Sequence, residues 1–363
     1  MKVVIIATEP SGDYLASELI KSLKNKRKKI FISGVGGELM QQNGLLSWVS
    51  IKNFNAIGIF EVVIRIFKFI KLMNLVERKI RETDPDIVIT VDSPSFSYRI
   101  IKRLQDIREK TRFIHYVAPT VWAWKSYRAK IFANLYDKIF TLFKFEPRYF
   151  LKHGLDSEFI GHQIFYEKKK ILKKKKIISF LPGSRSTEIK NNMKKIKNTI
   201  YECQKKIKGF EFFVLTFDHN KELVKSFINN NKVNVITNFN QKQTIMMQSH
   251  LAVAASGSVT LELINYKTPM VVFYDTHWLT KIIIKKLVKV KFASIINIFY
   301  NKEIIPEFLF ENLNSKSIFS AIKNLTYNSA SRREQLEHFN NFSKEMLVNG
   351  DNPSELFVKK LKI

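Results

Sequence analysis

The feature that most constrains the fold is a unit of strand, small-residue loop and helix that occurs at the start of each half of the chain. In the first half, an apolar run at residues 3–8 passes through the loop 9–13 into a helical pattern. In the second half, the run 177–181 does the same through the loop 182–185. Such a loop presents free backbone N–H groups and the positive end of a helix dipole, which favour a bound anion. Arg185 in the second loop can hold a phosphate bidentately, and an ordinary turn with a surface arginine is the alternative.

Strand and helix patterns alternate along both halves. The expected strands lie at residues 3–8, 30–35, 87–91, 113–118, 138–142 and 157–160, and then at 177–181, 211–216, 233–237, 251–255 and 270–273. The expected helices lie at 13–25, 59–82, 98–110, 126–134 and 146–152, then after 186, at 220–229, 244–249 and 260–266, from 277 onward, and in the tail 317–363. This alternation predicts parallel sheets with helices on both faces, which bind ligands at the carboxyl ends of the strands.

The chain length of 363 residues allows two domains that each bury a core. We expect a first domain at residues 1–166 and a second at 177–344. Residues 167–176 carry seven lysines, and charges of one sign at this density repel one another and stay solvated. We interpret this stretch as a linker between the domains, with a nucleic-acid contact as the alternative.

An excess of 61 Lys and Arg over 32 Asp and Glu gives a formal net charge of +29. This favours an anionic partner such as nucleic acid, an acidic membrane surface or a phosphorylated substrate. The alternative is compositional, since A/T-rich coding also enriches a protein in Lys, Asn, Ile and Phe. The charges are scattered and the sequence contains no known nucleic-acid-binding module, so we expect no nucleic-acid partner.

Several functional classes are excluded by what the sequence lacks. Cys203 is the single cysteine, which excludes an internal disulfide and a multi-cysteine metal cluster and fits a reducing compartment. The seven histidines have no metal-binding spacing, so we expect no metal ion. There is no targeting segment and no run of about 18 uncharged apolar residues, so we expect no transmembrane helix.

Two motifs carry candidate catalytic or binding groups. Asp92 follows an apolar strand, so its carboxylate can enter the crevice at the end of the sheet and act as a base; a turn or cap aspartate is the alternative. Ser256, Gly257 and Ser258 form a third small-residue loop, and Glu262 lies one helical turn further on. This loop can hold a phosphate while Glu262 accepts hydrogen bonds from a ribose, and a capped helix with an acidic first turn is the alternative.

Aromatic and basic apolar stretches suggest contacts with a lipid. Residues 115–124 combine a strand with a loop that carries two tryptophans, which is a candidate ligand platform. Residues 57–82 and 278–292 place aliphatic and aromatic side chains among basic ones, as is typical of segments at a membrane interface. Packing in the core is the alternative for all three stretches.

Taken together, these motifs resemble the lipid-A-disaccharide synthases, a family of inverting glycosyltransferases (family 19) whose α/β fold has two Rossmann-like domains facing a cleft (GT-B). The matching stretches run in family order between residues 3 and 311: Glu9-Pro-Ser-Gly-Asp13, Gly34-Val-Gly-Gly37, Ala56-Ile-Gly-Ile-Phe-Glu61, Val91-Asp-Ser-Pro94, His115-Tyr-Val-Ala-Pro-Thr-Val-Trp-Ala-Trp124, Phe159-Ile-Gly-His162, Leu181-Pro-Gly-Ser-Arg185, Ser256-Gly-Ser-Val-Thr-Leu-Glu262, Asn297 and Pro306-Glu-Phe-Leu309. The long block at 115–124 is the most specific. Thr8, Ser95 and Phe310 depart from the family pattern, in which Gly, a second acid and Gln are usual; Ser95 leaves Asp92 as the candidate base.

The resemblance implies a reaction and a set of site residues. UDP-2,3-diacylglucosamine is joined to 2,3-diacylglucosamine 1-phosphate (lipid X), which forms the β-1,6 lipid A disaccharide 1-phosphate and releases UDP without a metal or cofactor. Asp92 is the implied catalytic base. The implied substrate-binding residues are Glu9, Ser11, Gly12, Asp13, His115, Trp122, Trp124, Gly183, Ser184, Arg185, Ser256, Gly257, Ser258, Glu262, Asn297 and Glu307. The last helices, at about 345–363, are implied to pack on the first domain.

The acylated substrates also imply where the protein acts in the cell. Two other enzymes remain as alternatives to the implied function. We expect a cytoplasmic protein that binds peripherally to the anionic cytoplasmic face of the inner membrane of a Gram-negative type of bacterium, and the sequence is compatible with a homodimer. The alternative enzymes are another glycosyltransferase that uses a UDP sugar and a UDP-N-acetylglucosamine epimerase on the same scaffold.

Overall fold

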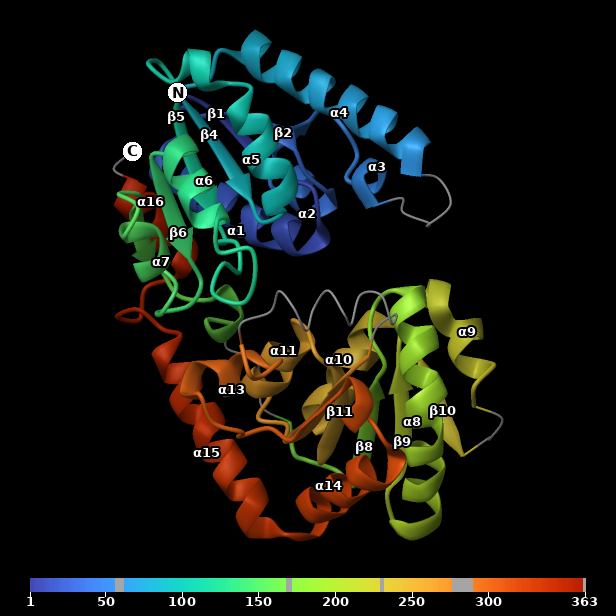
Figure 1. Cartoon of the computed structure of the whole chain (residues 1–363). Coiled ribbons are helices and arrows are strands. Elements are labelled where there is room, and N and C mark those ends of the chain that lie inside the picture. The colour runs from blue at the N-terminus through green and yellow to red at the C-terminus, as the bar shows by residue number, and fades with distance from the viewer. Residues whose placement is uncertain (56–61, 168–171, 229–231, 276–289, 362–363) are drawn as a thin grey trace. The chain divides into compact units, whose positions relative to one another are not determined.

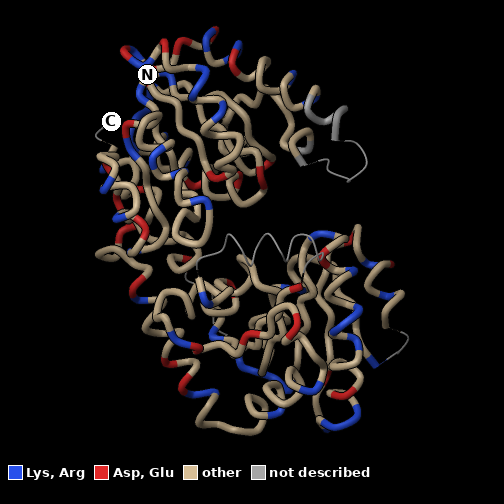
Figure 2. Tube along the Cα trace, viewed as in Figure 1, with Lys and Arg blue, Asp and Glu red and all other residues tan. Residues whose placement is uncertain are grey.

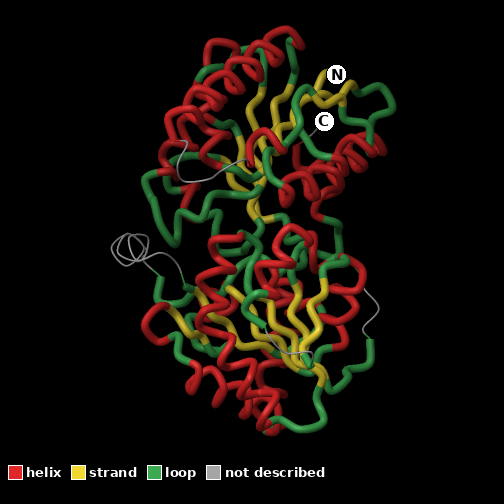
Figure 3. Tube along the Cα trace, turned by 90° about the vertical axis from the view of Figure 1, so that its right-hand side faces the viewer, coloured by secondary structure: helices red, strands yellow, loops and turns green. Residues whose placement is uncertain are grey.

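The computed structural model describes residues 1–55, 62–167, 172–228, 232–275 and 290–361 and divides into two compact units (Figure 1). The first unit comprises Met1–Tyr166 and Met346–Ile363, and the second comprises Glu167–Glu345. Each unit contains one sheet of parallel strands with helices packed on it (Figure 3). The predicted α/β class with parallel sheets is therefore confirmed.

The first unit is built on a seven-stranded sheet with the order β3-β2-β1-β4-β5-β6-β7. Its strands are β1 (Lys2–Ala7), β2 (Phe31–Val35), β3 (Leu46–Ser47), β4 (Ile87–Val91), β5 (Arg112–Tyr116), β6 (Lys138–Thr141) and β7 (Asp156–Phe159). Its helices are α1 (Pro10–Lys26), α2 (Glu38–Gln42), α3 (Lys52–Asn55), α4 (Val62–Thr83), α5 (Pro94–Lys102), α6 (Arg128–Leu135), α7 (Arg148–Leu151) and α16 (Pro353–Leu361). The central strands β1 and β4 pair from Val3↔Ile87 to Ala7↔Val91, so their carboxyl ends lie side by side.

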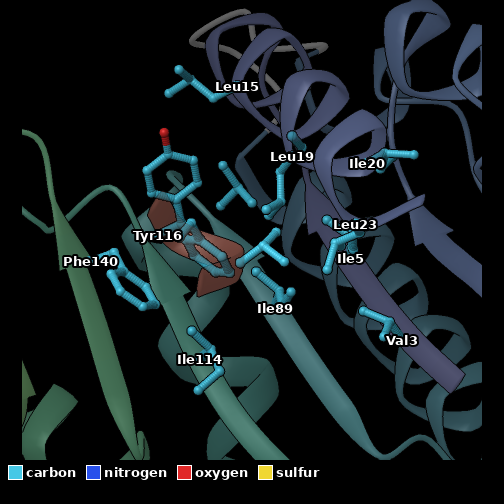
Figure 4. Packing of buried hydrophobic residues seen from close by; sticks show 14 of the residues in the cluster. Val3, Ile5, Leu15, Leu19, Ile20, Leu23, Ile89, Ile114, Tyr116 and Phe140 are labelled. Atoms are coloured by element: carbon cyan, nitrogen blue, oxygen red, sulfur yellow. The ribbon is translucent and has the colours of Figure 1, made fainter. Parts of the chain in front are cut away.

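Two hydrophobic clusters, one on each face of this sheet, form the core of the first unit, because successive residues of a buried strand point to opposite faces. On one face, Val3, Ile5 and Ile89 pack against leucines of α1 (Figure 4). The same cluster includes Phe357 of the C-terminal helix α16, whose ring centroid lies 4.2 Å from that of Phe140. The end of the chain thus completes the core of the unit that contains its beginning.

The second unit is built on a six-stranded sheet with the order β10-β9-β8-β11-β12-β13. Its strands are β8 (Ile177–Leu181), β9 (Glu211–Leu215), β10 (Val233–Ile236), β11 (Leu251–Ala255), β12 (Met270–Tyr274) and β13 (Glu307–Leu309). Its helices are α8 (Ser186–Lys206), α9 (Lys221–Lys225), α10 (Phe239–Gln248), α11 (Val259–Asn265), α13 (Ile295–Tyr300), α14 (Ser315–Tyr327) and α15 (Ser329–Glu345). Buried residues of β8, β9, β11 and β12 pack against α8 and α14 to form its core.

In the described part of the lysine-rich stretch, Lys173, Lys175 and Lys176 are exposed as expected, whereas Lys174 is bonded to the second unit. The Lys174 ammonium group donates to the carbonyl oxygens of Met247 (2.8 Å) and Tyr266 (3.1 Å) and to the hydroxyl of Thr268 (2.5 Å). Burial lowers the pKa of Lys174 to about 7. Lys174 therefore anchors this end of the stretch to the second unit, while residues 168–171 lie outside the described part.

Candidate active site

In the second unit, the loops that follow β8, β9 and β11 surround a pocket of about 210 Å³. These three strands are neighbours in the sheet, so the pocket lies at their carboxyl ends, where parallel sheets bind ligands. Six of the predicted binding residues line it: Gly183, Ser184, Ser256, Gly257, Ser258 and Glu262. Arg185 follows Ser184 directly and is exposed at the N-cap of α8.

The loop 182–185 is held in shape by polar side chains from α8. Gly183 has a φ of +121°, which favours glycine, and a Cβ atom there would lie 2.6 Å from the carboxyl group of Glu188. Glu188 accepts a hydrogen bond from the Ser184 N–H (3.2 Å), and the buried Asn192 amide donates to the Pro182 carbonyl (2.8 Å). The sequence analysis missed both residues, although their positions in the first two turns of the helix place them on the face next to the loop.

An aromatic and basic wall, which the sequence analysis also missed, lines the same pocket. Phe217 follows β9 and is 43% exposed, and Phe239 begins α10 and is 65% exposed. The Lys242 ammonium group lies 3.9 Å from the centroid of the Phe217 ring. Burial lowers the pKa of Lys242, while the charges of Asp218 and Glu262 oppose that shift. Large exposed aromatic rings at a strand end are available for stacking on a planar ligand.

In the first unit, the Asp92 carboxylate is fixed at the carboxyl end of β4. Its Oδ2 accepts a hydrogen bond from the Ser11 hydroxyl (2.8 Å), and its Oδ1 accepts one from the Ser93 N–H (2.7 Å). Asp92 and Ser93 both have positive φ values, +56° and +45°, so the chain turns sharply before α5. The Ser93 hydroxyl donates to Glu9 (3.0 Å). The predicted residues Glu9, Ser11 and Asp92 are thus brought together.

Gly12 is required for the close approach of α1 to the strands. A Cβ atom at this position would lie 3.1 Å from the Val91 carbonyl oxygen and 3.2 Å from the Ala7 Cβ. Both distances are tighter than ordinary van der Waals contacts, so any side chain would push the helix away from the sheet. Gly12 therefore sets the position of Ser11, the hydrogen-bond donor to Asp92.

Two predicted binding residues of the first unit have structural roles. The buried Asp13 carboxylate accepts hydrogen bonds from the N–H groups of Gly37 (2.8 Å) and Met40 (3.1 Å), so it caps α2. His115 is 0% exposed, its Nδ1 lies 2.7 Å from the Thr90 hydroxyl, and burial lowers its pKa to about 3. In this structure the imidazole is buried among protein atoms, and a direct contact of His115 with a substrate stays a prediction.

Asn297 and Glu307, two further predicted binding residues, bond to one another in this structure. Asn297 is 0% exposed, and its side chain donates to the Ile305 carbonyl (2.8 Å) and to Glu307 (2.8 Å). Glu307 also accepts hydrogen bonds from the N–H groups of Ala293 (2.7 Å) and Ser294 (2.7 Å). These contacts fasten α13 to the edge strand β13, and the predicted contact of either residue with a ligand stays a prediction.

The two tryptophans of the aromatic loop differ in environment. The Trp122 indole N–H donates to Glu146 (3.1 Å), and the other Glu146 oxygen accepts from the N–H groups of Leu142 (3.1 Å) and Phe143 (3.0 Å). Burial raises the pKa of Glu146 to about 7. Trp124 is 36% exposed, and the Lys125 ammonium group lies 4.2 Å from its ring centroid. Trp124 is therefore the more exposed of the pair, while Trp122 is half-buried.

Within the described residues, no group of three or more His, Cys, Asp or Glu side chains is arranged to hold a metal ion. The cations near the candidate sites are Lys and Arg side chains, such as Lys242 in the second unit and Lys125 in the first. Lys and Arg side chains are spread over both units (Figure 2).

Comparisons with known proteins identify the family. Residues 3–360 match the family described as lipid-A-disaccharide synthetase. The lipid-A-disaccharide synthase of Rickettsia prowazekii is 36% identical over 348 residues, which cover 92% of this chain and 91% of the relative. That of Rickettsia bellii is 35% identical over 95% of this chain and 94% of the relative.

Solved structures of more distant proteins share the fold. The UDP-GlcNAc 2-epimerase of Neisseria meningitidis, solved with UDP-GlcNAc, superposes with a TM-score of 0.67 at 13% identity and full coverage of both chains. The Methanocaldococcus jannaschii enzyme, solved with UDP-GlcNAc and UDP, gives 0.63 at 14% identity, with 100% of this chain and 99% of that chain covered. The predicted class of two Rossmann-like domains is thereby confirmed. The chain belongs to the lipid-A-disaccharide synthetase family.

Proposed function

We propose that the protein is a glycosyltransferase that joins UDP-2,3-diacylglucosamine to 2,3-diacylglucosamine 1-phosphate, forms the β-1,6 lipid A disaccharide 1-phosphate and releases UDP. The observation that carries this proposal is the family match over residues 3–360, together with relatives that cover more than nine-tenths of the chain.

The pocket of the second unit is the proposed donor site. Its loops 182–185 and 256–258 bring backbone N–H groups to helix N-termini, which suits the two phosphates of UDP. Glu262, one turn into α11, can accept hydrogen bonds from the ribose hydroxyls, and the exposed ring of Phe217 can stack on uracil. Arg185 adds a cation that stabilises the diphosphate as it leaves.

The Asp92 loop of the first unit is the proposed acceptor site. Asp92 takes the proton from the acceptor 6-hydroxyl while that oxygen attacks the anomeric carbon of the donor sugar. The bond between this carbon and the diphosphate oxygen breaks with its electron pair, so UDP leaves and the anomeric configuration inverts. Ser11 and the Ser93 N–H support the assignment, because each orients one carboxylate oxygen.

We further propose that the protein binds peripherally to the anionic cytoplasmic face of the inner membrane. No described helix is long and apolar enough to span a bilayer. The first turns of α4 with described side chains carry exposed Phe67 (63%) and Ile70 (40%) beside exposed Lys68 and Lys71. An apolar and basic surface of this kind suits an interface with acidic lipids. The adjoining residues 57–61 and most of the segment 278–292 lie outside the described part.

The test is to incubate the purified protein with both diacylated sugars and to follow UDP and the disaccharide. We expect equal amounts of the two products, formed only when both substrates are present and without loss after treatment with a chelator. A parallel incubation with UDP-N-acetylglucosamine alone tests the epimerase alternative. Conversion of that single substrate, without formation of a disaccharide in the first reaction, would overturn the proposal.

A further inference from the structure

We propose that Arg128 binds the phosphate group of the acceptor sugar, an inference that rests on the proposed transferase function. Arg128 is the first residue of α6, and its side chain is 8% exposed. Its Nη2 donates to the Ser95 hydroxyl (2.9 Å). Its Nε is buried and has no hydrogen-bond acceptor within the part of the chain that the structure describes. The guanidinium group thus keeps donors that the protein itself does not use.

The charge of this side chain is also uncompensated. Other arginines of the first unit form ion pairs, as Arg81 does with Asp106 (2.7 Å) and Arg108 with Asp137 (2.7 Å). Among the described residues, no carboxylate lies within ion-pair distance of Arg128, although it is more buried than either of them. Removing a cation from water without a counter-ion destabilises the folded protein. A bound anion would offset this loss of stability, which no described carboxylate offsets in the enzyme without a ligand.

The position of Arg128 connects it to the proposed base. Its hydrogen-bond partner Ser95 is exposed and lies in the first turn of α5, three residues after Asp92. Three residues span at most about 11 Å, so the guanidinium group lies within the reach of a sugar phosphate whose hydroxyl contacts Asp92. The nearby carboxylates Asp92 and Glu9 accept hydrogen bonds from Ser11 and Ser93 and form no ion pair with Arg128.

The surroundings favour a phosphate rather than a neutral group. Arg99 donates to the Ser95 carbonyl (2.6 Å), and Lys125 lies over the face of Trp124 (4.2 Å from its centroid). The Arg128 guanidinium carbon lies 5.8 Å from the same ring centroid. Two guanidinium groups, those of Arg99 and Arg128, therefore bond an exposed serine at the N-terminus of α5, and Lys125 lies over the neighbouring Trp124 ring. A planar guanidinium group beside a hydroxyl matches the oxygens of a phosphate monoester, and the acceptor carries one such group.

The test compares wild type with Arg128→Met on acceptors with and without the 1-phosphate, in neutral detergent micelles that contain no anionic lipid. For the phosphorylated acceptor, we expect kcat/KM to fall about 10- to 100-fold, mainly through KM, because a charged hydrogen bond is lost. For the dephosphorylated acceptor, wild type and variant are expected to be equally slow. Equal losses with both acceptors, or no loss with either, would overturn the inference.

Two controls separate this outcome from other causes. Arg108→Met removes a guanidinium group that is paired with Asp137, and it should not change the preference for the phosphorylated acceptor. Arg128→Lys retains the charge without the planar fork and should recover part of the loss.

The melting temperature of free Arg128→Met should equal or exceed that of wild type, since an uncompensated buried charge is removed; a large decrease would mark a structural role. If wild type itself releases no UDP with either acceptor, the proposed function fails rather than the assignment of Arg128.

Discussion

At the scale of single residues, the proposed chemistry depends on how the Asp92 carboxylate is held. Replacing it with Asn keeps the shape but removes the base, so we expect turnover to fall about 10²- to 10⁴-fold while the protein stays folded. The measurement is the rate of UDP release at saturating substrates. Asp86 offers a matched control, because it precedes the same strand at its amino end and accepts a hydrogen bond from the Lys2 N–H (2.7 Å). Normal turnover by Asp92→Asn would remove Asp92 from the mechanism.

Arg185 is expected to act on the donor. Its exposed side chain follows the pocket residue Ser184, so it is available to a diphosphate at the N-terminus of α8. Lysine keeps the charge but loses the planar fork, and we expect Arg185→Lys to weaken UDP binding about tenfold or more. Calorimetric titration with UDP measures this, with Arg333→Lys on α15 as the control. A donor affinity equal to that of wild type would place Arg185 outside the site.

Glu146 should make the stability of the first unit depend on pH. Burial raises its pKa in the folded state to about 7, above its ordinary value of 4.5. The folded state therefore favours the protonated carboxyl group. The resulting contribution of Glu146 to the free energy of unfolding is complete below about pH 4.5 and is lost as the pH rises through about 7. Glu146→Gln removes the titration, so the melting temperature of the variant relative to wild type should rise between pH 5 and 8. A constant difference across that range would show that Glu146 does not titrate there.

The sequence could identify chemistry-bearing residues but not the atoms that they contact. Glu262 and Asn297 both belong to stretches that resemble the family. Glu262 lines the pocket, whereas Asn297 is fully buried. The difference arises because β13 brings Glu307 beside α13. There the Glu307 carboxylate accepts a hydrogen bond from the Asn297 side-chain amide. Such partners are set by tertiary packing, and spacing along the chain does not report them. The pocket residues Glu188 and Phe217 escaped prediction for the same reason.

At the scale of elements, the two ends of α4 differ in how deeply their apolar side chains are buried. Met73, Val76 and Ile80 are buried against the sheet, whereas Phe67 and Ile70 are exposed one to two turns earlier. The periodicity of the sequence predicted a helix here and an amphipathic character. It could not tell which apolar positions would pack on the sheet, because both parts of the helix have the same pattern.

The exposed end of α4 leads to a prediction about membranes. Reversing two charges with Lys68→Glu and Lys71→Glu should weaken binding to vesicles that contain anionic lipid at least tenfold, since each basic residue near such a surface contributes about 1 kcal/mol. Sedimentation with vesicles at low and high salt measures this. The charge-matched control is the pair Lys28→Glu and Lys29→Glu, which are exposed beyond the end of α1. Equal binding by all proteins would contradict docking through α4.

Most strands and long helices were predicted, as were the short helices α7 and α9, whereas some of the shortest elements were not. The helix after residue 186 and the central strands match their expected positions, because each buries a continuous apolar face. The two-residue strand β3, the three-residue edge strand β13 and the short helix α2 were missed. Elements of this length are too short to show a period, and they are held by partners such as Asp13, which caps α2.

At the scale of the whole molecule, the proposed donor site lies in one unit and the proposed base in the other. The units have separate cores, and the chain returns to the first unit through α16. The sequence predicted two α/β halves from its repeated strand–loop–helix unit. It did not show that the lysine-rich stretch belongs to the second unit. A run of lysines predicts solvation, but a single ammonium group can instead donate to carbonyl oxygens of a folded unit, as Lys174 does.

The measurement that tests this division most directly is the affinity for UDP of two variants, one from each unit. Asp92→Asn should bind UDP as wild type does, because its site lies in the first unit and its defect is in turnover. Glu262→Gln should bind UDP about tenfold more weakly, because a charged hydrogen bond to the ribose is lost. Weakened UDP binding by Asp92→Asn, or wild-type binding by Glu262→Gln, would contradict the assignment of donor and base to separate units.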